Sequence, residues 1–97
     1  MLSKRNFKAK DEVEITFEND ANGASEVALV SEITNWEPVE MKKYRGVWRT
    51  KVRAPKNGEF QFRYLVDGSN WANDEAADAY VPNNVTGDNN SVVKTYE

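Results

Sequence analysis

A short stretch in the second half of the chain most constrains the fold. Every second residue in it is large and apolar: Phe60, Phe62, Tyr64 and Val66. The residues between them are Gln61, Arg63 and Leu65. Because successive side chains of a strand point to opposite faces, this alternation predicts a β-strand whose aromatic row packs into a core. The Asp67-Gly68 pair that follows favours a tight hairpin turn.

Four further segments have strand patterns, and turn-forming residues separate them. They cover residues 13–17, 26–30, 48–53 and 91–95. In the third segment Trp48 alternates with basic residues, so we expect its indole in the core. No long segment keeps apolar positions at the helical spacing, and residues 75–79 are too short for more than one helical turn. The sequence therefore predicts an all-β fold, an immunoglobulin-like antiparallel β-sandwich of about seven strands.

The chain length sets the domain number. With 97 residues, the chain is expected to form one domain over residues 1–97. No apolar run approaches the ~20 residues that a membrane-spanning helix needs. The first five residues include Lys4 and Arg5 but no apolar segment follows them, unlike a secretory signal peptide. We therefore expect a cytoplasmic monomer that does not bind membranes.

Two residue types are absent, and their absence narrows the chemistry. The chain contains no histidine and no cysteine. This excludes the most frequent general base and every Ser-His or Cys-His nucleophile, so we expect no enzyme, no metal and no cofactor. The formal net charge of −3 disfavours binding to a phosphate backbone, so we expect no nucleic-acid partner. A neutral ligand is the expectation that remains.

Two of the three tryptophans occur in polar segments. Trp36 lies between Asn35 and Glu37-Pro38, and Trp71 lies between Asn70 and Ala72-Asn73. A tryptophan in such a segment can keep an indole face open, and a flat aromatic face suits the apolar C–H face of a sugar ring. Each indole could instead close one end of the sandwich. Both interpretations stay open on these residues alone.

Polar side chains near Trp71 have two interpretations each. The carboxylates Asp74, Glu75 and Asp78 would serve a glycoside hydrolase only if two of them faced each other across a cleft, ~5–9.5 Å apart. We expect a hydrated turn instead, because the segment is alanine-rich and polar. Four asparagines after Tyr80 are turn formers whose amides also suit sugar hydroxyls, namely Asn83, Asn84, Asn89 and Asn90.

Together these segments resemble a known family. The matching residues are Thr34-Asn35-Trp36, Gly46-Val47-Trp48, Phe60 to Gly68, Trp71-Ala72-Asn73-Asp74, Tyr80-Val81-Pro82-Asn83 and Asn90-Ser91-Val92-Val93. In this order they resemble family 48 carbohydrate-binding modules, the early set domains of isoamylases and glycogen-branching enzymes. The glycogen-binding domain of the AMP-activated kinase β subunit is similar too. The resemblance covers the chain from about Val13 to Val93.

The resemblance implies a ligand and a set of contact residues. It implies a non-catalytic module that binds an α-1,4-linked glucan such as glycogen, starch or a maltooligosaccharide. Trp36 and Trp71 would form the sugar platform, Arg63 and Asn90 would bond hydroxyls, and Val85 or Thr86 would replace a leucine of the family. The alternative is a domain that docks onto a glycogen-metabolising enzyme without binding sugar itself.

Overall fold

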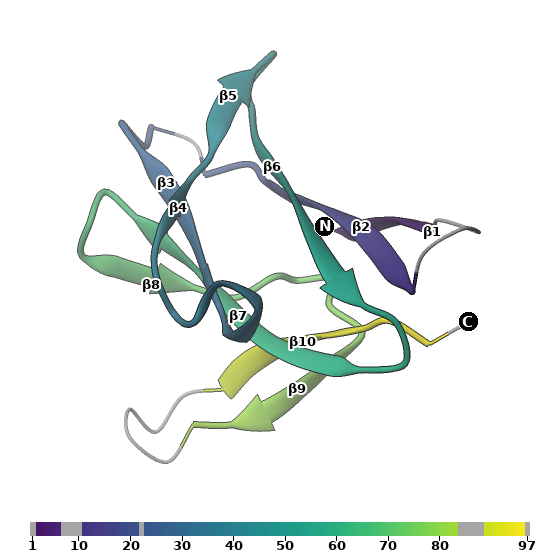
Figure 1. Cartoon of the computed structure of the whole chain (residues 1–97). Coiled ribbons are helices and arrows are strands. Elements are labelled where there is room, and N and C mark those ends of the chain that lie inside the picture. Colours follow the sequence, from purple (N-terminus) through teal and green to yellow (C-terminus); the bar gives the residue numbers. More distant parts are fainter. Residues whose placement is uncertain (1, 7–10, 22, 84–88, 97) are drawn as a thin grey trace.

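The computed structural model describes residues 2–6, 11–21, 23–83 and 89–96. Ten strands within these ranges form two antiparallel sheets that face each other (Figure 1). The first sheet has the order β1-β2-β6-β5, with bounds Leu2–Asn6, Glu12–Asn19, Val47–Pro55 and Lys42–Tyr44. The second has the order β4-β3-β7-β10-β9, with bounds Val39–Glu40, Val27–Ser31, Glu59–Val66, Asn89–Lys94 and Ala79–Pro82. Strand β8, Asn70–Ala72, also pairs with β7.

The predicted β-sandwich is confirmed, but the predicted strand number is wrong. The structure has ten strands rather than about seven. The additional strands are short, from two residues in β4 to five in β1. A segment of this length carries no readable period, so its strand conformation depends on the neighbour with which it pairs. The only helix in the described ranges is a single 3₁₀ turn, η1, over Glu32–Thr34.

The core lies between the sheets and follows the predicted alternation. On β2 the buried hydrophobic residues are Val13, Ile15 and Phe17, and on β7 they are Phe62 and Tyr64. Phe17 of the first sheet meets Phe62 of the second edge to face, with ring centroids 4.9 Å apart. Trp48 is buried against this cluster, as predicted. Aromatic edge-to-face contacts of this kind add to the burial energy and fix how the sheets face each other.

The N-terminal strand is tied to the opposite sheet by one carboxylate. The Lys4 ammonium of β1 lies 2.5 Å from the Asp78 carboxylate, next to β9. The same carboxylate accepts the backbone N–H of Lys94 at 2.8 Å. Burial acts to raise the pKa of Asp78, but these two hydrogen bonds and the two lysine charges outweigh burial and hold that pKa below its ordinary value.

Replacing Asp78 with asparagine is expected to lower the free energy of unfolding by about 1 kcal/mol at pH 7. A carboxylate with a lowered native pKa stabilises the fold above its unfolded pKa, and this contribution disappears as the pH falls through the native pKa. The difference between parent and D78N should therefore vanish between about pH 5 and pH 2. Urea unfolding at several pH values measures it. E75Q, in the same loop, is the control, and an equal loss at pH 7 and pH 3 would contradict the prediction.

Candidate functional site

Trp36 follows η1 in an unusual backbone conformation. The Trp36 N–H donates to the Ser31 carbonyl at 2.7 Å, and the Asn35 N–H donates to the Glu32 carbonyl at 3.2 Å. These are the two hydrogen bonds of a Schellman turn, which ends a helix. Asn35 and Trp36 both adopt left-handed backbone angles, with φ of 56° and 62°. Asparagine tolerates this conformation, whereas a bulky residue such as tryptophan does so at a cost of about 1 kcal/mol or more.

The hydroxyl of Thr34 locks this turn. It lies 3.1 Å from the Ser31 carbonyl and 2.9 Å from the Glu37 carbonyl, which are on either side of Trp36 in the chain. The hydroxyl can donate its proton to either oxygen. Ser31, at the end of β3, is fully buried and anchors the turn to the sheet. The result is an indole that is 45% exposed on a fixed support. The structure thus agrees with the predicted polar turn at Trp36.

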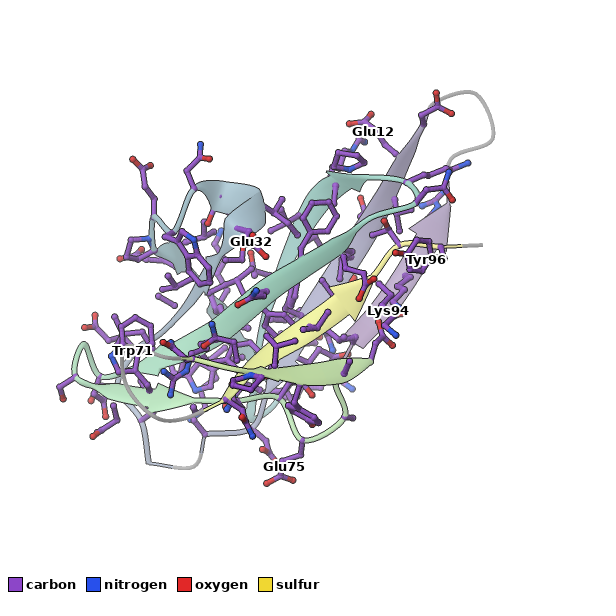
Figure 2. All side chains as sticks on the ribbon, turned by 90° about the horizontal axis from the view of Figure 1, so that it is seen from below. Glu12, Glu32, Trp71, Glu75, Lys94 and Tyr96 are labelled. Atoms are coloured by element: carbon purple, nitrogen blue, oxygen red, sulfur yellow. The ribbon has the colours of Figure 1, made fainter. Side chains whose placement is uncertain are left out.

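Trp71 lies on β8, beyond the predicted hairpin turn. Asp67 and Gly68 have φ of 52° and 72°, so β7 reverses into β8 as the sequence predicts. Trp71 is paired with Leu65 and is 49% exposed (Figure 2). The Arg63 guanidinium lies over the Trp71 ring, 5.4 Å from its centroid. A guanidinium at this distance attracts the ring through a cation–π contact, so Arg63 supports the indole from below.

Arg63 is less accessible than the sequence indicates. The alternation of β7 places it on the outer face of the sheet, with Gln61 and Leu65, as predicted. Its side chain is nevertheless only 7% exposed. The sequence pattern identifies the face, but it cannot show that Trp71 folds back over the guanidinium from a neighbouring strand. The main contact of Arg63 at this surface is therefore with the Trp71 indole, and little of its side chain is left to reach a ligand.

A row of amides connects Asn90 with the Trp36 turn. The Asn90 amide donates to the Gln61 side-chain oxygen at 2.9 Å, and the Asn83 amide donates to Asn90 at 3.2 Å. The backbone N–H of Gln61 donates to the Glu32 carboxylate at 2.6 Å. Glu32 belongs to η1, which contacts β7, so this row joins the turn to the sheet that carries Trp71.

The contact between Gln61 and Glu32 is not predicted by the sequence. Gln61 could have been found, because it shares a face with Arg63 on the same strand. Glu32 could not, since its partner is almost thirty residues away. The structure brings Arg63, Trp71 and Asn90 to one sheet face and connects the Trp36 turn to it. The convergence of the two indoles on one surface stays a prediction, and Val85 and Thr86 lie outside the described residues.

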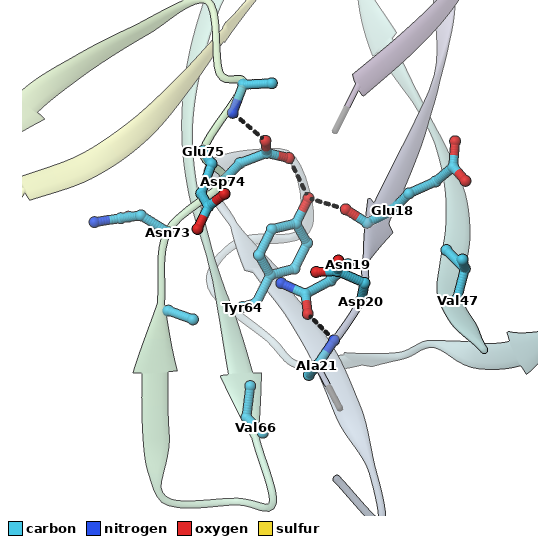
Figure 3. Close-up of a pocket in the computed structure, with 12 residues that line it drawn as sticks. Glu18, Asn19, Asp20, Ala21, Val47, Tyr64, Val66, Asn73, Asp74 and Glu75 are labelled. Atoms are coloured by element: carbon cyan, nitrogen blue, oxygen red, sulfur yellow. Dashed lines mark hydrogen bonds between the residues drawn. The ribbon is translucent and has the colours of Figure 1, made fainter. Parts of the chain in front are cut away.

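Of the three carboxylates near Trp71, Glu75 and Asp78 are exposed as predicted, but Asp74 is not part of a hydrated turn. Asp74 is only 2% exposed and accepts the Tyr64 hydroxyl at 2.7 Å and the Ala76 N–H at 2.8 Å (Figure 3). Its own N–H donates to the Ser91 hydroxyl at 2.9 Å. Burial, together with the bond to Asp74, raises the pKa of Tyr64 far above its ordinary value, so the phenol keeps its proton. Asp74 is therefore a structural carboxylate, while Glu75 is exposed.

Neither a metal-binding cluster nor a membrane-spanning helix occurs in the described ranges. No group of three or more acidic side chains there is arranged to hold a metal ion. None of the helical turns among those residues has the length and apolarity needed to span a bilayer.

Comparison with known proteins gives similarity at the level of structure. No family model matches the chain, and no curated protein matches it. Among solved structures, the apo form of a pullulanase from Paenibacillus barengoltzii is similar, with a TM-score of 0.52 and 29% identity. The match covers 80% of this chain but 13% of the pullulanase chain. The chain thus resembles a small part of a larger enzyme, and its assignment to family 48 stays a prediction.

Proposed function

We propose that this domain is a non-catalytic module that binds an α-1,4-linked glucan through Trp36 and Trp71. The similarity to a segment of a pullulanase supports a starch-related module. The segment is a small share of that enzyme, which agrees with an accessory part rather than a catalytic one. The pair of half-exposed indoles, held by different supports, is the observation that carries the proposal.

The physical argument begins with the cost of exposing an indole. Two tryptophans that are 45% and 49% exposed leave apolar area in water that a folded chain would otherwise cover. The Trp36 turn also holds a bulky residue in a left-handed conformation, and such conformations are concentrated at ligand sites. A sugar ring stacked on each indole would cover its exposed face. Each such contact would contribute ~1 kcal/mol in addition to the free energy from the buried apolar area.

The polar residues would add direction to this stacking. Asn90 and Gln61 are joined by a hydrogen bond, which fixes their amide groups before a ligand arrives. Asn90 is only 6% exposed, so its part is to hold Gln61 in place. The Gln61 amide is partly exposed and can both donate and accept, so it matches a hydroxyl of glucose. Arg63 is largely buried, and we assign it the support of Trp71 ahead of direct hydrogen bonding.

Titration with maltohexaose, observed by tryptophan fluorescence, tests the proposal. We expect saturable binding with a dissociation constant of roughly 10 μM to 1 mM, because two stacking contacts and a few hydrogen bonds are available. Trp48 is buried and should contribute a constant background. Cellohexaose, with the same sugar units in β-linkage, is the matched control. Absence of a response at millimolar maltohexaose, or an equal response to both oligosaccharides, would refute the proposal.

A second candidate function is docking onto a glucan-metabolising enzyme without sugar binding. Tyr44 favours it, because it is 61% exposed on β5, in the sheet opposite to the one that carries Trp71. Arg45 lies 5.3 Å from the centroid of that ring and adds a positive charge beside it. Tyrosine and arginine are enriched at protein interfaces. This function predicts no fluorescence response to either oligosaccharide and a complex that the Y44A variant loses.

A further inference from the structure

A cavity of about 500 Å³ opens at one end of the sandwich. It lies where the end of β2, the start of β6 and the β7–β8 hairpin meet, and the residues after β8 close its side (Figure 3). We propose that this cavity is a docking site for an arginine side chain on an exposed segment of a partner protein. The proposal is independent of glucan binding.

Two exposed carboxylates give the cavity a negative rim. Four acidic residues line the cavity, and no lysine or arginine is among the described residues that line it. The Glu18 carboxylate is paired with Arg49 at 2.9 Å, and the buried Asp74 carboxylate accepts the Tyr64 hydroxyl and the Ala76 N–H. Asp20 and Glu75 are exposed and present their carboxylates to an occupant. Apolar groups such as Val47 and Val66 make up much of the remaining wall. An ammonium or guanidinium on an aliphatic stem satisfies both features, because the stem packs on apolar groups while the charged end meets the carboxylates.

The floor of the cavity has more acceptors than donors. The Tyr64 hydroxyl lies 2.7 Å from the Asp74 carboxylate and 3.3 Å from the Glu18 carbonyl. A phenol carries one proton, so it cannot donate to both oxygens at once. An occupant that brings several donors suits these oxygens better than one that brings acceptors.

Arginine fits better than the alternatives. Its planar guanidinium carries five donors and binds carboxylates in pairs, whereas lysine has a single strongly hydrated charge. A sugar would bring no positive charge to the carboxylates, and the Tyr64 ring is fully buried and provides no stacking face. The volume lies in the range of ligand pockets and exceeds what one side chain fills, so the neighbouring residues of the partner segment would enter too.

The test is an NMR titration of the full chain with acetyl-Ala-Arg-Ala-amide. We expect the backbone amides of Ala21, Val66 and Ala72 to shift and to saturate at millimolar peptide. The matched peptide contains citrulline, which keeps the shape and loses the charge, and it should leave these amides unshifted. The double variant D20N/E75Q should weaken binding about fivefold or more, as the loss of rim charges does. The E12Q/E14Q variant removes the same charge at the other end of β2 and should bind like the parent.

Three results would overturn the proposal. The first is that the lining amides do not shift even at about 50 mM arginine peptide, roughly ten times the concentration at which we expect saturation. The second is an equal response to the citrulline peptide or to maltohexaose, which would indicate a neutral ligand. The third is a shift of the same amides with protein concentration alone, which would mean that a second copy of this chain occupies the cavity.

Discussion

A variant with alanine in place of Asp74 is expected to be less stable than the parent by about 3 kcal/mol in the free energy of unfolding. The carboxylate is 2% exposed and accepts hydrogen bonds from the Tyr64 hydroxyl and the Ala76 N–H. Its removal leaves the buried Tyr64 hydroxyl with the more distant of its two acceptors, the Glu18 carbonyl at 3.3 Å. Small domains are stable by roughly 5–15 kcal/mol in total, so this loss is large.

Chemical denaturation of D74A and the parent measures this difference. The E75A variant is the neighbouring control and should lie within about 0.5 kcal/mol of the parent, because Glu75 is exposed. The Y64F variant removes the same hydrogen bond from the other side. Its cost and that of D74A should not add in the double variant, since both remove one shared contact. A D74A protein as stable as E75A would show that the buried carboxylate has no structural role.

The sequence predicts the long strands because burial there follows from neighbours along the chain. The alternation around Phe62 and Tyr64 and the row from Val13 to Phe17 match the buried faces of β7 and β2. The same reasoning fails for β8 and β9, whose strand conformation depends on pairing with β7 and β10. Local pattern is informative where a strand exceeds about five residues, and pairing decides below that length.

The candidate site was predictable in its residue types but not in its depth. The polar surroundings of Trp36 and Trp71 leave open whether the indoles are exposed, and in the structure both residues are about half exposed. The burial of Asp74 and Arg63 was not predictable. Asp74 is covered because Ser91, seventeen residues further along the chain, comes to bond its N–H. Arg63 is covered because the hairpin returns Trp71 over it. Long-range contacts of this kind leave no periodic signal in the sequence.

Replacing Trp71 with alanine is expected to weaken maltohexaose binding at least about tenfold. Arg63 lies against one side of the indole, so we expect a glucose ring to stack on the opposite side. The variant removes this stacking area and exposes the Arg63 charge, which then takes up water rather than supporting a ring. Isothermal titration calorimetry measures the change, because it does not depend on the fluorescence of the residue that is replaced.

Two control variants and one stability measurement show whether the loss of binding is due to stacking on Trp71. The Y44A variant also removes an exposed aromatic ring, but from the opposite sheet, so it should bind like the parent. The W71F variant keeps a smaller flat ring and should retain an intermediate affinity. The W71A protein should unfold close to the parent, since the indole is half exposed and fills no core position. If W71A bound like the parent while W36A did not, the sugar would stack at the Trp36 turn alone, and the hairpin that carries Trp71 would have no part in recognition.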